Sequence, residues 1–292
     1  MPDPGGKLIG RHSPLSQQLF VAAIWGAGII GIAFPVAILS FLIVKGIPVL
    51  SWSFLVLPPE GFPLGRSGGI APAILGSLSL ISVGLMLAVP AAVFSALYTS
   101  QYCTSPKILN VVRFSAEVLA AVPSILYGLF GYALLVVLFG LNVSLLAGGI
   151  TLGLMMVPVI FVGSHEAFNA ASRDLRQAVL SLGVSKAHYI GRILLPRSVP
   201  AILTVVVLAS MHAMGSAAPV LYTAAIVNAI GELRLDTPVM TLPTHIFYLV
   251  GEAISLDHAC GTALVLVAIL VVGNASAGYL KQKYKRASDE LE

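Results

Sequence analysis

His212 and Ser216 are the pair of polar side chains whose types and spacing could do chemistry within an apolar stretch of this sequence. On a helix, residues four positions apart lie on the same face, so the imidazole and the hydroxyl would point the same way. A protonated histidine could bind an anion. A histidine held between packed helices is the alternative, and the sequence leaves both open.

Glu117 is the other candidate, because it stands at the start of an apolar stretch, four residues after Arg113. That spacing predicts an ion pair on one helix face. The alternative is a gate contact beside a polar pathway.

The most informative polar stretch is residues 166–198, which is basic and half apolar. Ser172 can cap a first short helix, and Gly183 would end it in the left-handed conformation. Ser185 can cap a second helix, and the chain would re-enter an apolar region at Pro196. Such a helix–turn–helix could dock onto another protein or rest on lipid headgroups.

The sequence lacks the common motifs for catalysis and for binding ATP or metal ions. It contains no Gly-x-x-x-x-Gly-Lys-Ser/Thr phosphate-binding loop, no His-Glu-x-x-His motif, no cysteine cluster and no Gly-x-Ser-x-Gly elbow. We therefore predict no catalytic residue, no metal site and no cofactor, and no ATP hydrolysis by this chain.

Composition determines the elements that must position these residues. Charged residues make up 10% of the 292 residues and hydrophobic residues 58%, whereas a soluble domain has about 25% charged residues. A bilayer needs about 20 apolar residues per helical crossing, and backbone groups in lipid must bond within the segment. The sequence predicts an all-α integral membrane protein with six transmembrane helices, at roughly 18–44, 72–99, 114–139, 143–164, 199–226 and 259–280.

The basic residues predict the orientation. With both termini in the cytoplasm, 13 of the 16 Lys and Arg residues lie on the cytoplasmic side, as the positive-inside rule requires. The net charge of +4 then follows from topology and membrane lipid, and no nucleic-acid partner is predicted. The expected parts are a cytoplasmic segment 1–17, one transmembrane domain 18–280 and a cytoplasmic tail 281–292.

The spacing within 166–198 resembles the cytoplasmic coupling loop of ABC-type importer permeases. That family's pattern is Glu-Ala-Ala, three residues, Gly, nine residues, Ile-x-Leu-Pro. This chain keeps every spacing, with Gln177 in place of Glu and Val179 in place of the second Ala. The resemblance implies a type I importer bundle whose coupling helices dock on an ATPase. It assigns that coupling to Leu175, Gln177, Ala178, Val179, Gly183, Lys186, Ile193, Leu195 and Pro196.

The same resemblance implies the partners and the location. A cytoplasmic ABC ATPase dimer would bind the ATP, and a second homologous permease subunit would complete the pathway. An external substrate-binding protein would deliver cargo to the external segments 45–70 and 232–258. The complex would lie in the plasma (inner) membrane.

Other blocks resemble phosphate-specific importer permeases, and their order and spacing are similar to those of the PstA-type subunit. These blocks are Gly68-Gly69-Ile70 with Pro72, Gly76-Ser77, Pro90 and Tyr98; residues 122–131 (VPSILYGLFG); and residues 242–247 (LPTHIF).

The candidate pathway residues are Glu117, His212 and Ser216, and one departure from that family concerns the last two. Phosphate permeases carry Arg-Ala-Leu-Gly-Glu-Thr-Ala-Pro where this chain has residues 212–219 (HAMGSAAP), so His212 replaces Arg and Ser216 replaces Glu. Either the charged pair is dispensable, or the substrate is another oxyanion such as phosphonate or phosphite. A membrane scaffold or sensor without transport is the alternative of a different class.

Overall fold

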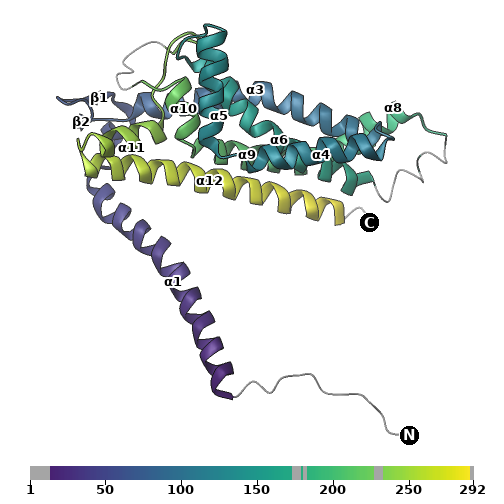
Figure 1. Cartoon of the computed structure of the whole chain (residues 1–292), viewed down its shortest axis with the longest axis horizontal. Helices are drawn as coiled ribbons and strands as arrows, with labels where there is room; N and C mark the ends of the chain where they lie inside the picture. Colours follow the sequence, from purple (N-terminus) through teal and green to yellow (C-terminus); the bar gives the residue numbers. More distant parts are fainter. Residues whose placement is uncertain (1–13, 173–178, 180–182, 227–232, 290–292) are drawn as a thin grey trace.

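The computed structural model describes residues 14–172, 179, 183–226 and 233–289, and this part is mostly helical (Figure 1). The helices are α1 (Pro14–Gly46), α2 (Trp52–Val56), α3 (Ala71–Gln101), α4 (Pro106–Ala121), α5 (Ser124–Gly131), α6 (Leu145–Ser172), α8 (Lys186–Tyr189), α9 (Leu195–Met214), α10 (Ala218–Thr223), α11 (Leu242–Gly251) and α12 (Leu256–Asp289). A 3-10 turn (Ile47–Val49) and two π-helical stretches (Tyr132–Leu138 and Ile190–Leu194) extend them.

The bundle has two ends. A short antiparallel hairpin, β1 (Pro59–Glu60) and β2 (Ser67–Gly68), lies with α10 and α11 at one of them, which we call the hairpin end. The other, which we call the α8 end, holds α8 and the C-terminal part of α12 (Figure 1). The hairpin is a small addition to the predicted all-helical fold.

Five helices are long and apolar enough to cross a membrane, and a bent pair brings the number to six. The bent pair corrects the predicted third span at 114–139. Instead of one helix, α4 and the α5 segment meet at an angle of 96°. Pro123 explains the break, because proline disfavours a helical conformation in the residue before it, and Val122 is extended (φ −65°, ψ 129°).

The fifth span also differs from its prediction. The helical segment runs without a break from Lys186 to Met214, so the predicted span 199–226 begins too late and ends too late. The helix continues through Pro196, where the chain was predicted to re-enter an apolar region. This proline stands in the first turn of α9, where a missing N–H is tolerated, directly after the π-helical stretch.

The fourth span is longer than the predicted 143–164, because α6 continues through Ser172. Ser172 is thus the last residue of α6, and its capping role toward the next helix stays a prediction. The helix predicted from about 173 to 182 lies mostly outside the described residues.

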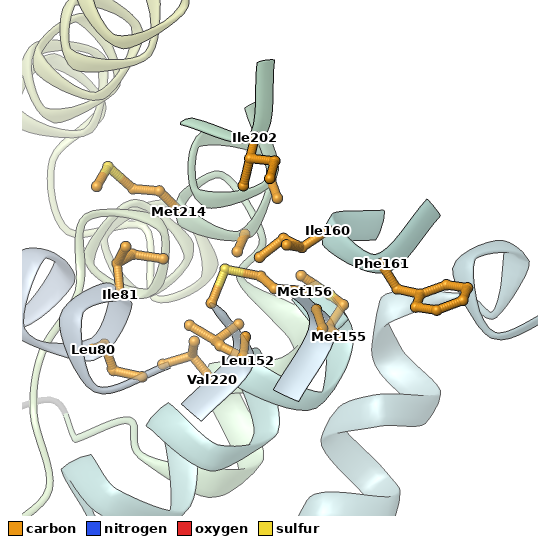
Figure 2. Packing of buried hydrophobic residues seen from close by; sticks show 14 of the residues in the cluster. Leu80, Ile81, Leu152, Met155, Met156, Ile160, Phe161, Ile202, Met214 and Val220 are labelled. Carbon is orange, nitrogen blue, oxygen red and sulfur yellow. The ribbon is translucent and has the colours of Figure 1, made fainter. Parts of the chain in front are cut away.

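The core forms where α3, α6 and α9 pack together (Figure 2). The face of α3 toward α6 consists of small residues four apart: Gly84, Ala88, Ala92 and Ala96, and the three alanines are fully buried. Small residues let helices approach closely, which is the main source of packing between helices in a membrane. Larger side chains fill the rest of the core, among them Leu80, Ile81, Leu152, Met156 and Val220 (Figure 2).

The helix α1 diverges from the bundle (Figure 1), and no residue in its most apolar stretch is buried. It contacts the bundle at its last turn, where a Cβ atom on Gly46 would lie 2.8 Å from the carbonyl oxygen of Cys260 in α12. Lys45 Nζ lies 3.7 Å from Asp257 Oδ1 beside this contact. The contact therefore requires a glycine, and the rest of α1 faces lipid or another subunit.

The crossing of α3 and α6 gives a first prediction. A Cβ atom at Gly84 would lie 3.1 Å from the carbonyl oxygen of Gly149 and 3.2 Å from the amide nitrogen of Gly153. We expect Gly84→Val to force the helices apart at a cost of about 1–3 kcal/mol, measured as a lower melting temperature in detergent. Gly28→Val is the matched control, because Gly28 has no atom within 4 Å of its Cβ position. Equal melting temperatures for the two variants would contradict this account of the packing.

Candidate functional site

The described part of the 166–198 segment turns at Gly183. Its φ of +74° is the left-handed conformation expected after a helix end, and its Cβ position has no atom within 4 Å. Val179 lies half-buried against the core. Leu175, Gln177 and Ala178 fall outside the described residues, and their coupling role stays a prediction.

The second predicted helix of this segment begins where expected. The Ser185 hydroxyl accepts a hydrogen bond from the His188 amide at 3.3 Å, which caps α8. Ile193 and Leu195 are half-buried against the core, whereas Pro196 is exposed. The apolar part of the pattern therefore anchors the segment to the bundle.

Lys186 folds back onto the bundle. Its Nζ lies 4.1 Å from the ring centroid of Tyr102, just past the end of α3, and Tyr102 stacks on Tyr98 with centroids 6.3 Å apart. A cation over an aromatic face is attracted by its quadrupole. The contact ties α8 to α3, and the sequence pattern gave no sign of Tyr102.

Polar side chains also join α3 to α6 at the α8 end. Thr99 Oγ1 lies 3.1 Å from Nδ1 of His165, and the Ser100 hydroxyl donates to the Asn169 side chain at 3.0 Å. Thr99 and His165 are both buried. These contacts hold the last turns of the two helices together next to the 166–198 segment.

His212 and Ser216 do not lie on one helix face, which corrects that expectation. The helix α9 ends at Met214, and Ser216 stands in the break before α10. Its hydroxyl donates to the carbonyl oxygen of His212 at 3.1 Å, and its amide donates to that of Ala213 at 3.1 Å. Ser216 thus satisfies carbonyls that the helix end leaves free, and the His212 side chain is exposed.

Ser216 also borders a small cavity in the bundle. The hydroxyl-bearing residues Ser77 and Thr241 line it from the other side, and the remaining walls are apolar. Of the three predicted pathway residues, Ser216 is the one that reaches this cavity.

Glu117 forms the ion pair that its spacing predicted. Its Oε1 lies 3.9 Å from Nη2 of Arg113, one turn earlier on α4, and both side chains are about half exposed, at 58% and 47%. An exposed pair of this kind contributes little to stability. In the part of the chain that the structure describes, the ion pair that Glu117 makes is with Arg113, and no contact joins it to His212 or Ser216.

A buried histidine lies at the hairpin end. His245 on α11 is 2% exposed, and its Nδ1 lies 3.2 Å from the hydroxyl of Thr262. That hydroxyl donates to the carbonyl of His258, so it accepts from His245, which places the ring proton on Nδ1. Among the described residues, the buried Nε2 has no hydrogen-bond partner.

The comparison with known families shows which family this chain belongs to. The family of binding-protein-dependent transport system inner membrane components matches residues 88–286, more than half of the chain. The chain belongs to this family. It is thus a multi-pass membrane permease of an ABC importer, and the predicted importer resemblance is confirmed.

Individual relatives cover most of this permease. The phosphate transport system permease protein PstA 2 of Mycobacterium bovis is 30% identical over 90% of this chain and 88% of its own length. The PstA protein of Yersinia pestis is 32% identical over 74% of this chain and 72% of its own. A probable ABC transporter permease of Bacillus subtilis, YqgI, is 29% identical over 84% and 88%.

Solved structures agree on the fold of the permease. The inward-facing methionine ABC transporter MetNI matches with a TM-score of 0.59 at 13% sequence identity, over 74% of this chain and 94% of that one. The predicted type I importer bundle is therefore confirmed. Among the described residues, no group of three His, Cys, Asp or Glu side chains could hold a metal ion.

The buried His245 of the permease gives a second prediction. Burial lowers its pKa to about 4, and repulsion from His258 adds to this effect. The unfolded chain takes up a proton near pH 6.5 while the folded chain does not. The folded state should therefore lose up to about 3 kcal/mol as the pH falls from 6.5 to 4.

The measurement is the melting temperature in detergent across that pH range. We expect His245→Gln, whose amide can still donate to Thr262, to show a smaller fall than the native permease. His188→Gln is the control, because His188 is exposed, and it should keep the native pH dependence. A native-like fall in His245→Gln would exclude His245 as the cause.

Proposed function

We propose that this chain is a PstA-type subunit of an ATP-driven importer and that inorganic phosphate is its substrate. The observation that carries the proposal is the similarity to phosphate permeases over up to nine-tenths of the chain. It forms half of an alternating-access pathway and contributes no chemical step. Its part is to bind partners, to change shape and to pass the motion of an ATPase to the pathway.

The orientation follows from charge. We place the α8 end and both termini in the cytoplasm, because 13 of the 16 basic residues then lie on the cytoplasmic side. The ATPase dimer, which binds the ATP, docks on the segment around Gly183. The substrate-binding protein docks at the hairpin end, and a second permease subunit completes the pathway.

We propose that the pathway passes the break between α9 and α10. Ser216 lies in this break and lines the cavity with Ser77 and Thr241, so hydroxyl groups are the polar lining on this side. Another oxyanion, such as phosphonate or phosphite, is the alternative substrate, because His212 and Ser216 stand where phosphate permeases have Arg and Glu. Because the chain is an importer permease, we do not propose that it is a membrane scaffold or sensor without transport.

The coupling role of the Gly183 turn gives a third prediction. Valine at φ +74° is strained because of its branched Cβ, so Gly183→Val should distort the docking segment. We expect loss of ATP-dependent phosphate uptake in vesicles holding the complex, while the complex still assembles.

Gly140→Val is the matched control, because Gly140 has a similar φ of +65° and an equally open Cβ position, in the loop before α6. It should transport phosphate like the native protein. If Gly183→Val also transports normally, the turn does not couple. If native vesicles hydrolyse ATP and move a different oxyanion, the importer assignment stands and the substrate is wrong.

The residues at the α9–α10 break give a fourth prediction. The double variant His212→Arg with Ser216→Glu restores the charged pair of the phosphate permeases. We expect it to change the ratio of phosphate to phosphite uptake, because a carboxylate would then stand at the cavity that Ser216 borders. Unchanged uptake and unchanged selectivity would remove both residues from the pathway.

A further inference from the structure

The helix α6 connects the two ends of the permease. Its 28 residues span about 42 Å at 1.5 Å per residue. It begins at Leu145 at the hairpin end and ends at Ser172, inside the 166–198 segment and eleven residues before Gly183. A displacement of its first turn therefore has a short covalent route to the ATPase docking site of the proposed function.

The first turn of α6 is held by a distant loop. A helix leaves its first four amides without partners inside the helix. The Ser144 amide donates to the Thr223 carbonyl at 3.0 Å, Leu145 to Thr237 at 2.8 Å and Leu146 to Leu235 at 3.0 Å. The last residue of α10 supplies one carbonyl partner for the start of α6, and residues 233–237 supply the other two.

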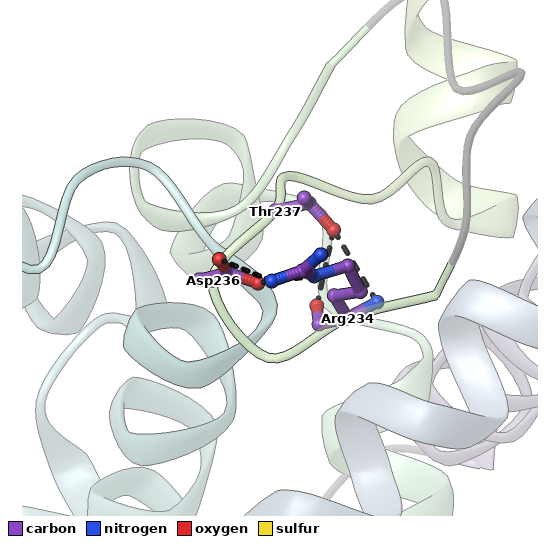
Figure 3. A network of polar contacts seen from close by, with 3 residues as sticks. All are labelled: Arg234, Asp236 and Thr237. Carbon is purple, nitrogen blue, oxygen red and sulfur yellow. Dashed lines mark hydrogen bonds and ion pairs between the residues drawn. The ribbon is translucent and has the colours of Figure 1, made fainter.

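The loop that supplies two of these carbonyls has its own cross-links (Figure 3). Arg234 donates from Nε to Asp236 Oδ1 at 3.1 Å and from Nη2 to Oδ2 at 3.3 Å. The Thr237 hydroxyl accepts from the Arg234 amide at 3.3 Å and donates to the Arg234 carbonyl at 3.1 Å. We call residues 233–237 the clip loop.

The clip loop is accessible from outside the bundle. The side chains of Arg234 and Asp236 are 62% and 67% exposed, so a partner at this end can reach them. An exposed ion pair contributes little to global stability. Its effect here is local, because it shapes the turn that presents the Leu235 and Thr237 carbonyls to α6.

The packing of α6 carries a displacement along the helix. Cβ atoms at Gly148 and Gly163 would contact Ala224 near the clip loop and Val205 on α9, respectively. A closely packed interior transmits strain, because it has few voids to absorb it. A shift at the clip loop should therefore reach the α8 end without being lost in side-chain rearrangement.

We propose that α6 relays the docking of the substrate-binding protein from the clip loop to the ATPase, with Arg234, Asp236 and Thr237 as positioning residues for its first turn. The inference rests on the proposed transport function. The relay acts on the coupling between two sites, so its loss should leave assembly and basal ATP hydrolysis unchanged.

The decisive variant is Leu145→Pro. Proline is tolerated in the first turn of a helix but has no amide to donate to Thr237. Leu145→Ala is the matched control. It keeps the backbone amide, and it removes more of the buried Leu145 side chain than Leu145→Pro does. The readout is ATP hydrolysis by the whole complex, basal and stimulated by the binding protein loaded with inorganic phosphate.

We expect Leu145→Pro to lower the stimulation at least about fivefold, the low end of typical coupling between sites, with basal hydrolysis unchanged. Leu145→Ala should keep the native stimulation even if its melting temperature falls. Native stimulation in Leu145→Pro, or equal loss in both variants, would overturn the relay.

Charge exchange tests the clip loop separately and also decides the case if Leu145→Pro fails to assemble. Arg234→Asp should lose stimulation, and Arg234→Asp with Asp236→Arg should recover it, because the pair is re-formed. Loss without recovery would mean that Arg234 contacts the binding protein directly and would overturn its positioning role. If the native complex itself is not stimulated, the proposed function fails, and the relay fails with it.

Discussion

The close packing of α6 against the small-residue face of α3 is the constraint on which the rest of the bundle depends. Lipid offers little hydrophobic drive for two helices to associate, so their contact must come from close approach. Gly84, Ala88, Ala92 and Ala96 on α3 provide it. Because α3 and α6 are fixed in this way, the Thr99–His165 contact and the Lys186–Tyr102 contact form at one end, and the clip loop reaches α6 at the other.

Hydropathy predicted most of the helices, because a bilayer sets the length and polarity of every crossing. The helices α1 and α3 begin and end close to the predicted limits, whereas α12 begins near its limit and continues to Asp289, past the predicted 280. The breaks at Pro123 and after Met214 were missed, because a run of apolar residues has the same hydropathy whether it is straight or bent. A proline was the available signal at both breaks, Pro123 at the first and Pro219, together with Gly215, at the second.

The candidate site was predictable only where its geometry is local. The turn at Gly183 and the cap at Ser185 follow from residue type and spacing, and both are present. Tyr102 under Lys186, Thr262 beside His245 and the carbonyl partners of Leu145 come from segments far apart in sequence. Such contacts depend on how helices pack, which a single sequence without an alignment does not specify.

The helices that follow the two breaks, α5 and α10, contact each other. This contact bears on the Arg and Glu that phosphate permeases carry and this chain lacks. A Cβ atom on Gly128 of α5 would lie 2.8 Å from the carbonyl oxygen of Ala218 at the start of α10. Irregular backbone at membrane depth persists where protein buries it or where it lines a polar route, and transporters place their substrates beside such breaks. A break has polar groups of the backbone besides the Ser216 hydroxyl, and these backbone groups remain whatever side chains stand at His212 and Ser216. A pathway built on these breaks can therefore lose the Arg and Glu of the phosphate permeases and still offer an anion polar partners.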